Sequence, residues 1–111
     1  MADVVIASAR DITPTATEPG LQRLVGAYNE KLLLAEHRMV KGWVGAAHSH
    51  PHDQVAYVVS GRLRVTASVS TFDLGAGDSF LVRGGMEHQA SALEDSVVLD
   101  VFTPCREDYI I

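Results

Sequence analysis

The most informative segment of the sequence is Gly42-Trp-Val-Gly-Ala-Ala-His48-Ser-His50-Pro-His52-Asp-Gln54-Val-Ala-Tyr-Val-Val-Ser-Gly61. Side chains on a β-strand alternate between its two faces, so the pair His48-Ser-His50 places two imidazoles on the same face. Neutral imidazole is the commonest metal ligand among side chains. The segment therefore predicts a metal site inside a small β-barrel.

The spacing of this segment resembles the first motif of a known family, the cupins, which is G-x5-H-x-H-x3-4-E-x6-G. Four residues fall at its positions, namely Gly42, His48, His50 and Gly61, and Gln54 stands where the family usually has Glu. A second segment, Gly77-Asp-Ser-Phe-Leu-Val-Arg83-Gly-Gly85-Met-Glu-His88, resembles the second motif, G-x5-P-x-G-x2-H-x3-N. It matches at Gly77, Gly85 and His88, with Arg83 in place of Pro and Ala92 in place of Asn.

This resemblance implies an all-β fold, a single-domain cupin jelly-roll barrel of the RmlC-like, cupin 2 type, with a metal site inside the barrel. The implied metal ligands are His48, His50, Gln54 and His88. We expect one cupin domain over residues 1–111, with its two motifs at residues 42–61 and 77–92. Residues 1–20 are expected to form an N-terminal arm that crosses the barrel or a neighbouring subunit.

Short apolar runs separated by turn residues also predict an all-β barrel or sandwich. The expected strands cover residues 4–8, 32–40, 44–50, 54–59, 63–68, 79–82, 88–92 and 96–102. Residues 21–25 are ambiguous, because the spacing of Leu21, Leu24 and Val25 also fits a helical turn.

Composition favours a small-molecule ligand. The chain has 111 residues, a net charge of -5 and nine basic residues spread along it, whereas nucleic acid requires a concentrated basic face. Cys105 is the sole cysteine, which excludes an internal disulfide and is consistent with a reducing compartment. The apolar run Val4-Val5-Ile6-Ala7 is far too short for a signal or membrane segment. We therefore expect a cytoplasmic protein that binds neither nucleic acid nor membrane.

The fourth metal ligand is open to one alternative. Without the interruption by Pro51, His52 would share the face of His48 and His50 and could replace Gln54, although the motif spacing favours Gln54. A neutral amide ligand at position 54 would leave the full positive charge of the ion on the site, which makes the metal a strong Lewis acid. One divalent ion of nickel, zinc, iron, cobalt or manganese suits such a ligand set.

The C-terminal run Val98-Leu-Asp100-Val-Phe102-Thr-Pro104-Cys-Arg106 supplies candidate catalytic residues. By alternation Asp100 and Phe102 share one face of a strand, and Pro104 ends that strand, which lets Arg106 fold back toward the same mouth. Alternatively, Asp100 and Arg106 form a structural ion pair at the barrel rim. His37 lies outside both motifs and is interpreted as structural.

This ending, together with three His and one Gln, resembles the single-domain cupins of pectin and alginate breakdown, the KdgF type. The resemblance implies that Asp100 and Arg106 are catalytic and that Phe102 and Arg106 contact an acidic sugar. The implied enzyme is a lyase or isomerase that opens a 4,5-unsaturated monouronate and tautomerises its enol to the linear keto form. Asp100 can remove the anomeric proton and then protonate the carbon that becomes saturated.

Two other functions fit the same motifs, a metal-dependent dioxygenase and a non-enzymatic cupin that binds a sugar or another small molecule. The lack of a Glu ligand argues against the dioxygenase, and a pure binding protein should tolerate the loss of Asp100. We also expect a homodimer, because small cupins usually pair through an edge strand, which the N-terminal arm can cover.

Overall fold

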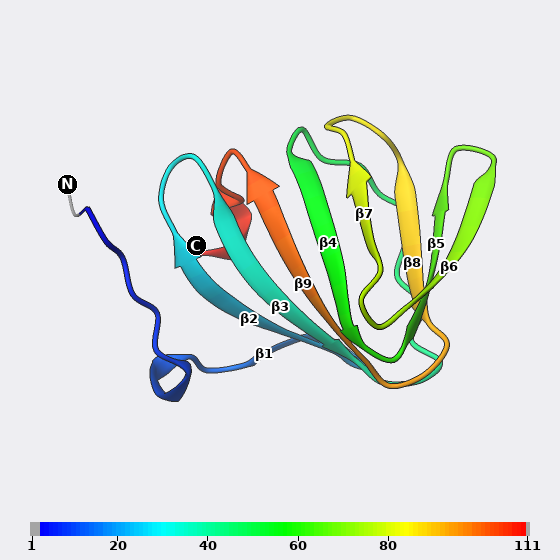
Figure 1. Cartoon of the computed structure of the whole chain (residues 1–111), viewed down its shortest axis with the longest axis horizontal. Coiled ribbons are helices and arrows are strands. Elements are labelled where there is room, and N and C mark those ends of the chain that lie inside the picture. The colour runs from blue at the N-terminus through cyan, green and yellow to red at the C-terminus, as the bar shows by residue number, and fades with distance from the viewer. Residues whose placement is uncertain (1–2, 111) are drawn as a thin grey trace.

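The computed structural model describes residues 3–110 and confirms the expected all-β fold, in which two antiparallel sheets face each other (Figure 1). In chain order the elements are η1 (Ala9–Asp11), β1 (Thr15–Glu18), β2 (Leu21–Tyr28), β3 (Leu33–Met39), β4 (Asp53–Ser60), β5 (Arg62–Ala67), β6 (Ser70–Gly75), β7 (Ser79–Val82), β8 (His88–Ala92), β9 (Ser96–Thr103) and η2 (Glu107–Tyr109). The larger sheet has the strand order β1-β2-β3-β9-β4-β7, and the smaller sheet has the order β6-β5-β8.

Alternating burial defines the inner face of the larger sheet. In β9, Ser96, Val98, Asp100 and Phe102 are buried, while the residues between them are partly exposed. β3 shows the same period of two, and so does most of β4. Both strands pair with β9, so their inward side chains lie next to those of β9.

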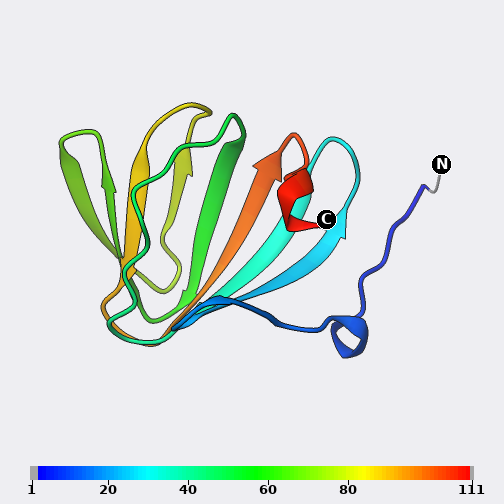
Figure 2. The same cartoon turned by 180° about the vertical axis from the view of Figure 1, so that it is seen from behind.

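Two apolar clusters fill the space between the sheets. The larger one joins both sheets and consists of Leu21, Met39, Ala56, Val58, Leu63, Val65, Ala92 and Val98. The smaller one consists of Leu33, Ala35, Phe102 and Cys105, and Tyr109 of η2 packs against it. Because η2 follows β9 directly, this packing holds the C-terminal turn beside the tip of β9, as Figure 2 shows from behind.

Several strand predictions need correction. Residues 4–8 form no strand, and the ambiguous residues 21–25 belong to β2, because pairing with β3 overrides the helical spacing. Residues 44–50 form no regular strand, and they meet β8 at the isolated bridges Val44–Ser91 and His48–His88. The sequence did not predict β1, and it missed β6 because β6 lacks a run of buried apolar residues.

The N-terminal arm runs away from the body of the molecule before β1 (Figures 1 and 2). The expectation that it crosses its own barrel is therefore wrong, apart from the pairing of β1 with β2. Residues 1 and 2 of the expected arm, and residue 111 of the expected domain, lie outside the described residues. Within residues 3–110 no helix has the length and apolar character needed to cross a membrane.

Candidate metal centre and active site

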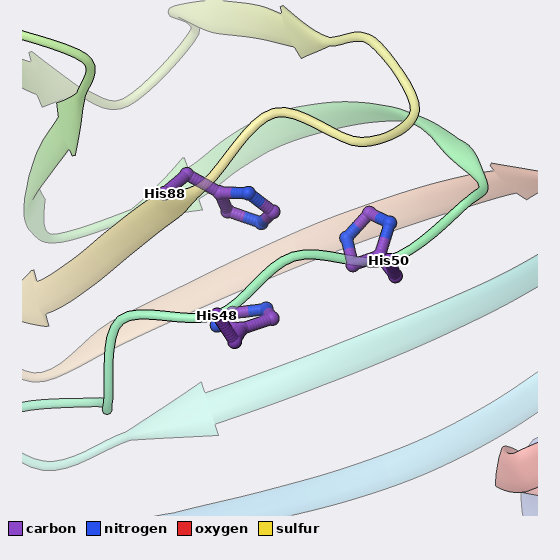
Figure 3. A group of neighbouring side chains, drawn as sticks. All are labelled: His48, His50 and His88. Carbon is purple, nitrogen blue, oxygen red and sulfur yellow. The ribbon is translucent and has the colours of Figure 1, made fainter.

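Three histidines meet on the inner side of the barrel. His48 and His50 lie in the segment between β3 and β4, and His88 begins β8, with the rings turned toward one another (Figure 3). Each ring offers a nitrogen atom, and these atoms all lie within 4.8 Å of one another. His88 is thereby placed beside the His48-Ser-His50 pair, as the sequence motifs predict.

Backbone hydrogen bonds fix the distance between the two histidine segments. The amides of His48 and His88 each donate to the other's carbonyl, at 2.9 Å, and the Gly85 amide donates to the His50 carbonyl at 2.8 Å. A Cβ at Gly84 would lie 2.2 Å from the Pro51 carbonyl oxygen, so only glycine fits there. The close approach of these loops is what brings the three rings together.

Backbone carbonyl groups hold each of the three rings in the tautomer that is protonated at Nδ1. Each Nδ1 lies next to a backbone carbonyl oxygen: that of Ala46 for His48 (3.0 Å), of His52 for His50 (3.0 Å) and of Met86 for His88 (2.9 Å). A carbonyl can only accept, so Nδ1 carries the proton and Nε2 keeps its lone pair. Bonds of this kind orient histidines that ligate metals.

Electrostatics also favours neutral rings at two of the three histidines. Burial lowers the pKa of both His50 and His88, and the positive charge of Arg106 lowers each of them further. Neutral imidazole is the form that binds a metal ion, because the ligand must offer a lone pair.

Gln54 lies between the histidine cluster and Asp100 and contacts both. Asp100 Oδ1 can only accept a hydrogen bond, so the Gln54 atom 2.8 Å from it is the donor Nε2. The amide oxygen Oε1 of Gln54 therefore faces His50 Nε2, at 3.0 Å. Since His50 already donates from Nδ1, two lone-pair atoms face each other across that gap. Both atoms could donate their lone pairs to one cation, which would relieve this repulsion, so the residues present fit a metal ion.

His52, the alternative fourth ligand, does not join this group. The cluster of potential ligand nitrogens contains His48, His50 and His88. The ring centroid of His52 is 5.7 Å from that of His50, and its buried Nδ1 has no hydrogen-bond partner among the described residues.

Asp100 lies at the centre of a second network. Its Oδ1 accepts from Gln54, and its Oδ2 lies 2.6 Å from His37 Nδ1. On its other side, His37 accepts a hydrogen bond from Arg23 Nε at 3.0 Å. The ion pair between Asp100 and Arg106, one of the two expectations from the sequence, does not form, because Arg106 binds Asp108 instead, at 2.9 Å.

The C-terminal turn brings Arg106 to the same cavity. The guanidinium lies 4.9 Å from the ring centroid of Phe102 and 4.2 Å from that of Tyr109. The Arg106 side chain is 13% exposed, and its bond to Asp108 lowers the pKa of that carboxyl group. Burial raises the pKa of Tyr109, so its phenol remains protonated.

These groups line one cavity of about 320 Å³. One part of its wall is polar and includes Arg23, His37, His48, Gln54, His88, Asp100 and Arg106, and another part is apolar and includes Leu21, Met39, Leu63, Val65, Phe80 and Val98. The cavity thus combines nitrogen and oxygen ligands, two carboxylates (those of Asp100 and Glu18) and two guanidinium groups with an apolar wall.

Comparison with known proteins identifies the fold family. Residues 35–102 match the Cupin domain family. The chain belongs to the cupin family. A curated relative, the pectin degradation protein KdgF of Dickeya dadantii (strain 3937), is 32% identical over 93 residues, which cover 82% of this chain and 84% of the relative.

Two solved cupin structures are similar over nearly the whole chain. KdgF from Halomonas sp. has a TM-score of 0.90 and 34% sequence identity, and the match covers 96% of this chain and 98% of that one. An RmlC-like cupin from Shewanella frigidimarina NCIMB 400 has a TM-score of 0.89 and 32% identity, with 94% of each chain covered. The chain is therefore a KdgF-like cupin with three histidines that could hold a metal ion.

Sequence reasoning missed the network behind Asp100. The sequence predicts a structural role for His37 and nothing for Arg23, yet the two form a hydrogen-bonded chain to the carboxylate. The signal was a polar residue at an inward position, because His37 alternates with the apolar residues Ala35 and Met39 in β3. A buried polar residue in such a pattern needs a partner.

Proposed function

We propose that this cupin is a metal-dependent enzyme that converts 4,5-unsaturated monouronates to their linear keto forms. The observation that carries the proposal is the position of Asp100, which lies in the histidine-lined cavity and bonds directly to Gln54. Similarity to pectin degradation proteins supports an acidic sugar as the substrate. The reaction needs one group that can both accept and donate a proton, and Asp100 is the carboxylate that lines this cavity beside the histidine cluster.

Asp100 removes the proton from the anomeric hydroxyl. The electrons of that O–H bond form the new carbonyl at the anomeric carbon, and the bond from this carbon to the ring oxygen breaks. The ring oxygen becomes the oxygen of an enolate. Asp100 then returns the proton to the carbon that becomes saturated, and the enolate relaxes to a ketone, so that the same carboxylate serves as base and as acid.

Arg106 and Phe102 bind the substrate. The guanidinium of Arg106 offers a planar donor to the sugar carboxylate, and Asp108 and the aromatic rings fix its orientation. Phe102 is 1% exposed and packs beside the site, where it excludes water from the reacting atoms.

His48, His50, His88 and Gln54 would hold the divalent metal. When bound there, the ion supplies positive charge that stabilises the enolate oxygen in the transition state. The neutral ligand set leaves that charge undiminished, which suits a substrate that brings its own carboxylate.

The test is the loss of ultraviolet absorbance of 4,5-unsaturated galacturonate, measured with metal-loaded and chelated protein and corrected for spontaneous opening. The proposal requires an acceleration that depends on the metal. If the metal is bound and the rate equals the spontaneous one, the protein is not a ring-opening enzyme for this substrate.

We further propose that the protein is a homodimer that uses the outer face of the larger sheet. Leu81, Val55, Val101 and Leu34 lie next to one another across β7, β4, β9 and β3 and form an apolar row. Within this row Leu81 is 67% exposed and Val55 is 44% exposed. An exposed apolar patch of this kind is typical of a protein interface.

The N-terminal arm argues for a second copy of this chain as the partner. Its residues Val4 and Ile6 are 74% and 81% exposed, and the arm leads away from its own sheets (Figure 1). Two unpartnered apolar surfaces on one chain can cover each other if two copies pack with twofold symmetry. Light scattering should give twice the chain mass of 12.0 kDa for the wild type and for the control Val69→Glu, and a smaller mass for Val55→Glu/Leu81→Glu. A monomeric wild type would refute the proposal.

A further inference from the structure

We propose that Arg23 and His37 are positioning residues that hold the Asp100 carboxylate in a single orientation for both of its proton transfers. The inference rests on the proposed ring-opening function. Both residues line the cavity of the metal centre, and neither touches the three-histidine cluster through a hydrogen bond.

Strand register explains how these side chains reach one another. Arg23 of β2 pairs directly with His37 of β3, and His37 lies opposite Val98, so Asp100 is its diagonal neighbour on the same face. The residues directly opposite Asp100 are Ala35 on one side and Ala56 on the other. Small side chains at these positions leave room for His37 and Gln54 to approach the carboxylate diagonally from opposite sides.

Arg23 determines the tautomer of His37. The Nε of arginine can only donate, so His37 Nε2 must accept and keeps its lone pair. A neutral imidazole then carries its proton on Nδ1, which donates to Asp100 Oδ2 at 2.6 Å. The guanidinium of Arg23 is itself fixed, since its carbon lies 3.5 Å from the ring centroid of Tyr109.

The result is a carboxylate that is clamped at both oxygens. His37 holds Oδ2 and Gln54 holds Oδ1, and both His37 and Asp100 are buried, at 6% and 5% exposed. The plane of the carboxylate is therefore fixed, while each oxygen retains a lone pair for the substrate. Because Asp100 must reach first an oxygen and then a carbon of the same sugar, a shift of about 1 Å would cost roughly 100-fold in rate.

Two substitutions at position 37 separate positioning from a general packing role. His37→Phe keeps a ring of similar size but removes the N–H, and we expect kcat to fall roughly 100-fold with little change in KM. His37→Asn places an amide N–H where Nδ1 was, and we expect its kcat to return to within about 10-fold of the wild type. Metal content and thermal unfolding are measured for each variant, so that loss of the metal or of the fold is recognised.

Arg23 is tested through the tautomer that it enforces. In protein loaded with Zn²⁺, the ¹⁵N spectrum of His37 should show Nδ1 protonated and Nε2 unprotonated. Arg23→Met keeps an aliphatic stem but removes the donor, so we expect a mixture of the two tautomers and a fall in kcat smaller than that of His37→Phe.

Each outcome bears on the inference. If the wild type accelerates ring opening and His37→Phe has the same kcat as the wild type, the positioning role is overturned. The proposed function would then remain intact. Equal losses in His37→Phe and His37→Asn, or an Nε2-protonated His37 in the wild type, would also overturn the positioning role. If the metal-loaded wild type does not accelerate ring opening, the proposed function fails first and the positioning role fails with it.

Discussion

Replacing Gln54 by Glu should make the stability of the metal-free protein depend on pH in a way that the wild type does not. The change restores the residue that cupins usually have at this position, yet it exchanges the N–H that binds Asp100 for a second carboxylate oxygen. The atoms concerned are 2.8 Å apart in the structure. Two carboxylates this close share one proton, as in aspartic protease dyads.

The size of the effect follows from that distance. Two unit charges 2.8 Å apart repel by about 6 kcal/mol at an effective dielectric constant near 20. This is equivalent to roughly 10⁴-fold in proton affinity, so the folded pair keeps one proton at pH 7. The unfolded chain releases its Glu proton near pH 4.3. Between these values the folded state binds more protons, so the free energy of unfolding falls as pH rises, by about 4 kcal/mol at pH 7.

Urea unfolding of chelated Gln54→Glu and wild-type protein at pH 5 and pH 7 measures this difference directly. Gln22→Glu is the matched control, because Gln22 is exposed on β2 and the same charge change there should cost less than about 0.5 kcal/mol. If the stability difference between Gln54→Glu and the wild type is the same at both pH values, the Gln54 amide does not face Asp100. The account of the fourth ligand would then be wrong.

Three further predictions concern the wild-type site. Asp100→Asn should lower kcat by about 10²–10⁴-fold and keep the metal, because Asn retains an oxygen for the Gln54 amide; retained turnover would remove Asp100 from the mechanism. Arg106→Ala should raise KM by about 10- to 100-fold with a smaller effect on kcat, and an unchanged KM would make Arg106 structural. Because burial lowers the pKa of His50 and His88, the unfolded chain binds more protons below about pH 6.5. The chelated protein should therefore lose stability as pH falls from 7 to 5, and His88→Gln should reduce that slope in urea unfolding.

The sequence predicts the motif geometry well because that geometry depends on local spacing. His48 and His50 are two residues apart, so alternation places them on one face, whereas their meeting with His88, 40 positions further along the chain, was implied by the resemblance to the two cupin motifs. Alternation likewise places Asp100 and Phe102 on one face of β9. The pairs His48/His50 and Asp100/Phe102 thus require only the period of two.

The partners of Asp100 could not be predicted in the same way. Whether Asp100 meets Arg106 or His37 depends on the register between β3 and β9, which joins residues 63 positions apart in the chain. One step of register would move His37 to the other face of the sheet. Residues 4–8 form no strand although their apolar run predicts one. An apolar run becomes a strand only if a neighbouring strand pairs with its backbone, and the alternation rule does not describe such pairing.

The charges of the site suit the acidic sugar that we propose as the substrate of this acidic chain. The protein carries a net charge of -5, yet the two carboxylates that line the cavity, those of Asp100 and Glu18, are balanced by the guanidinium groups of Arg23 and Arg106. The histidines and Gln54 are neutral, so a bound divalent ion adds positive charge that no protein ligand offsets. A substrate carboxylate would offset part of this positive charge. A neutral sugar of the same shape would offset none of this charge, so the proposed function predicts that uronates bind more tightly than neutral sugars of the same shape.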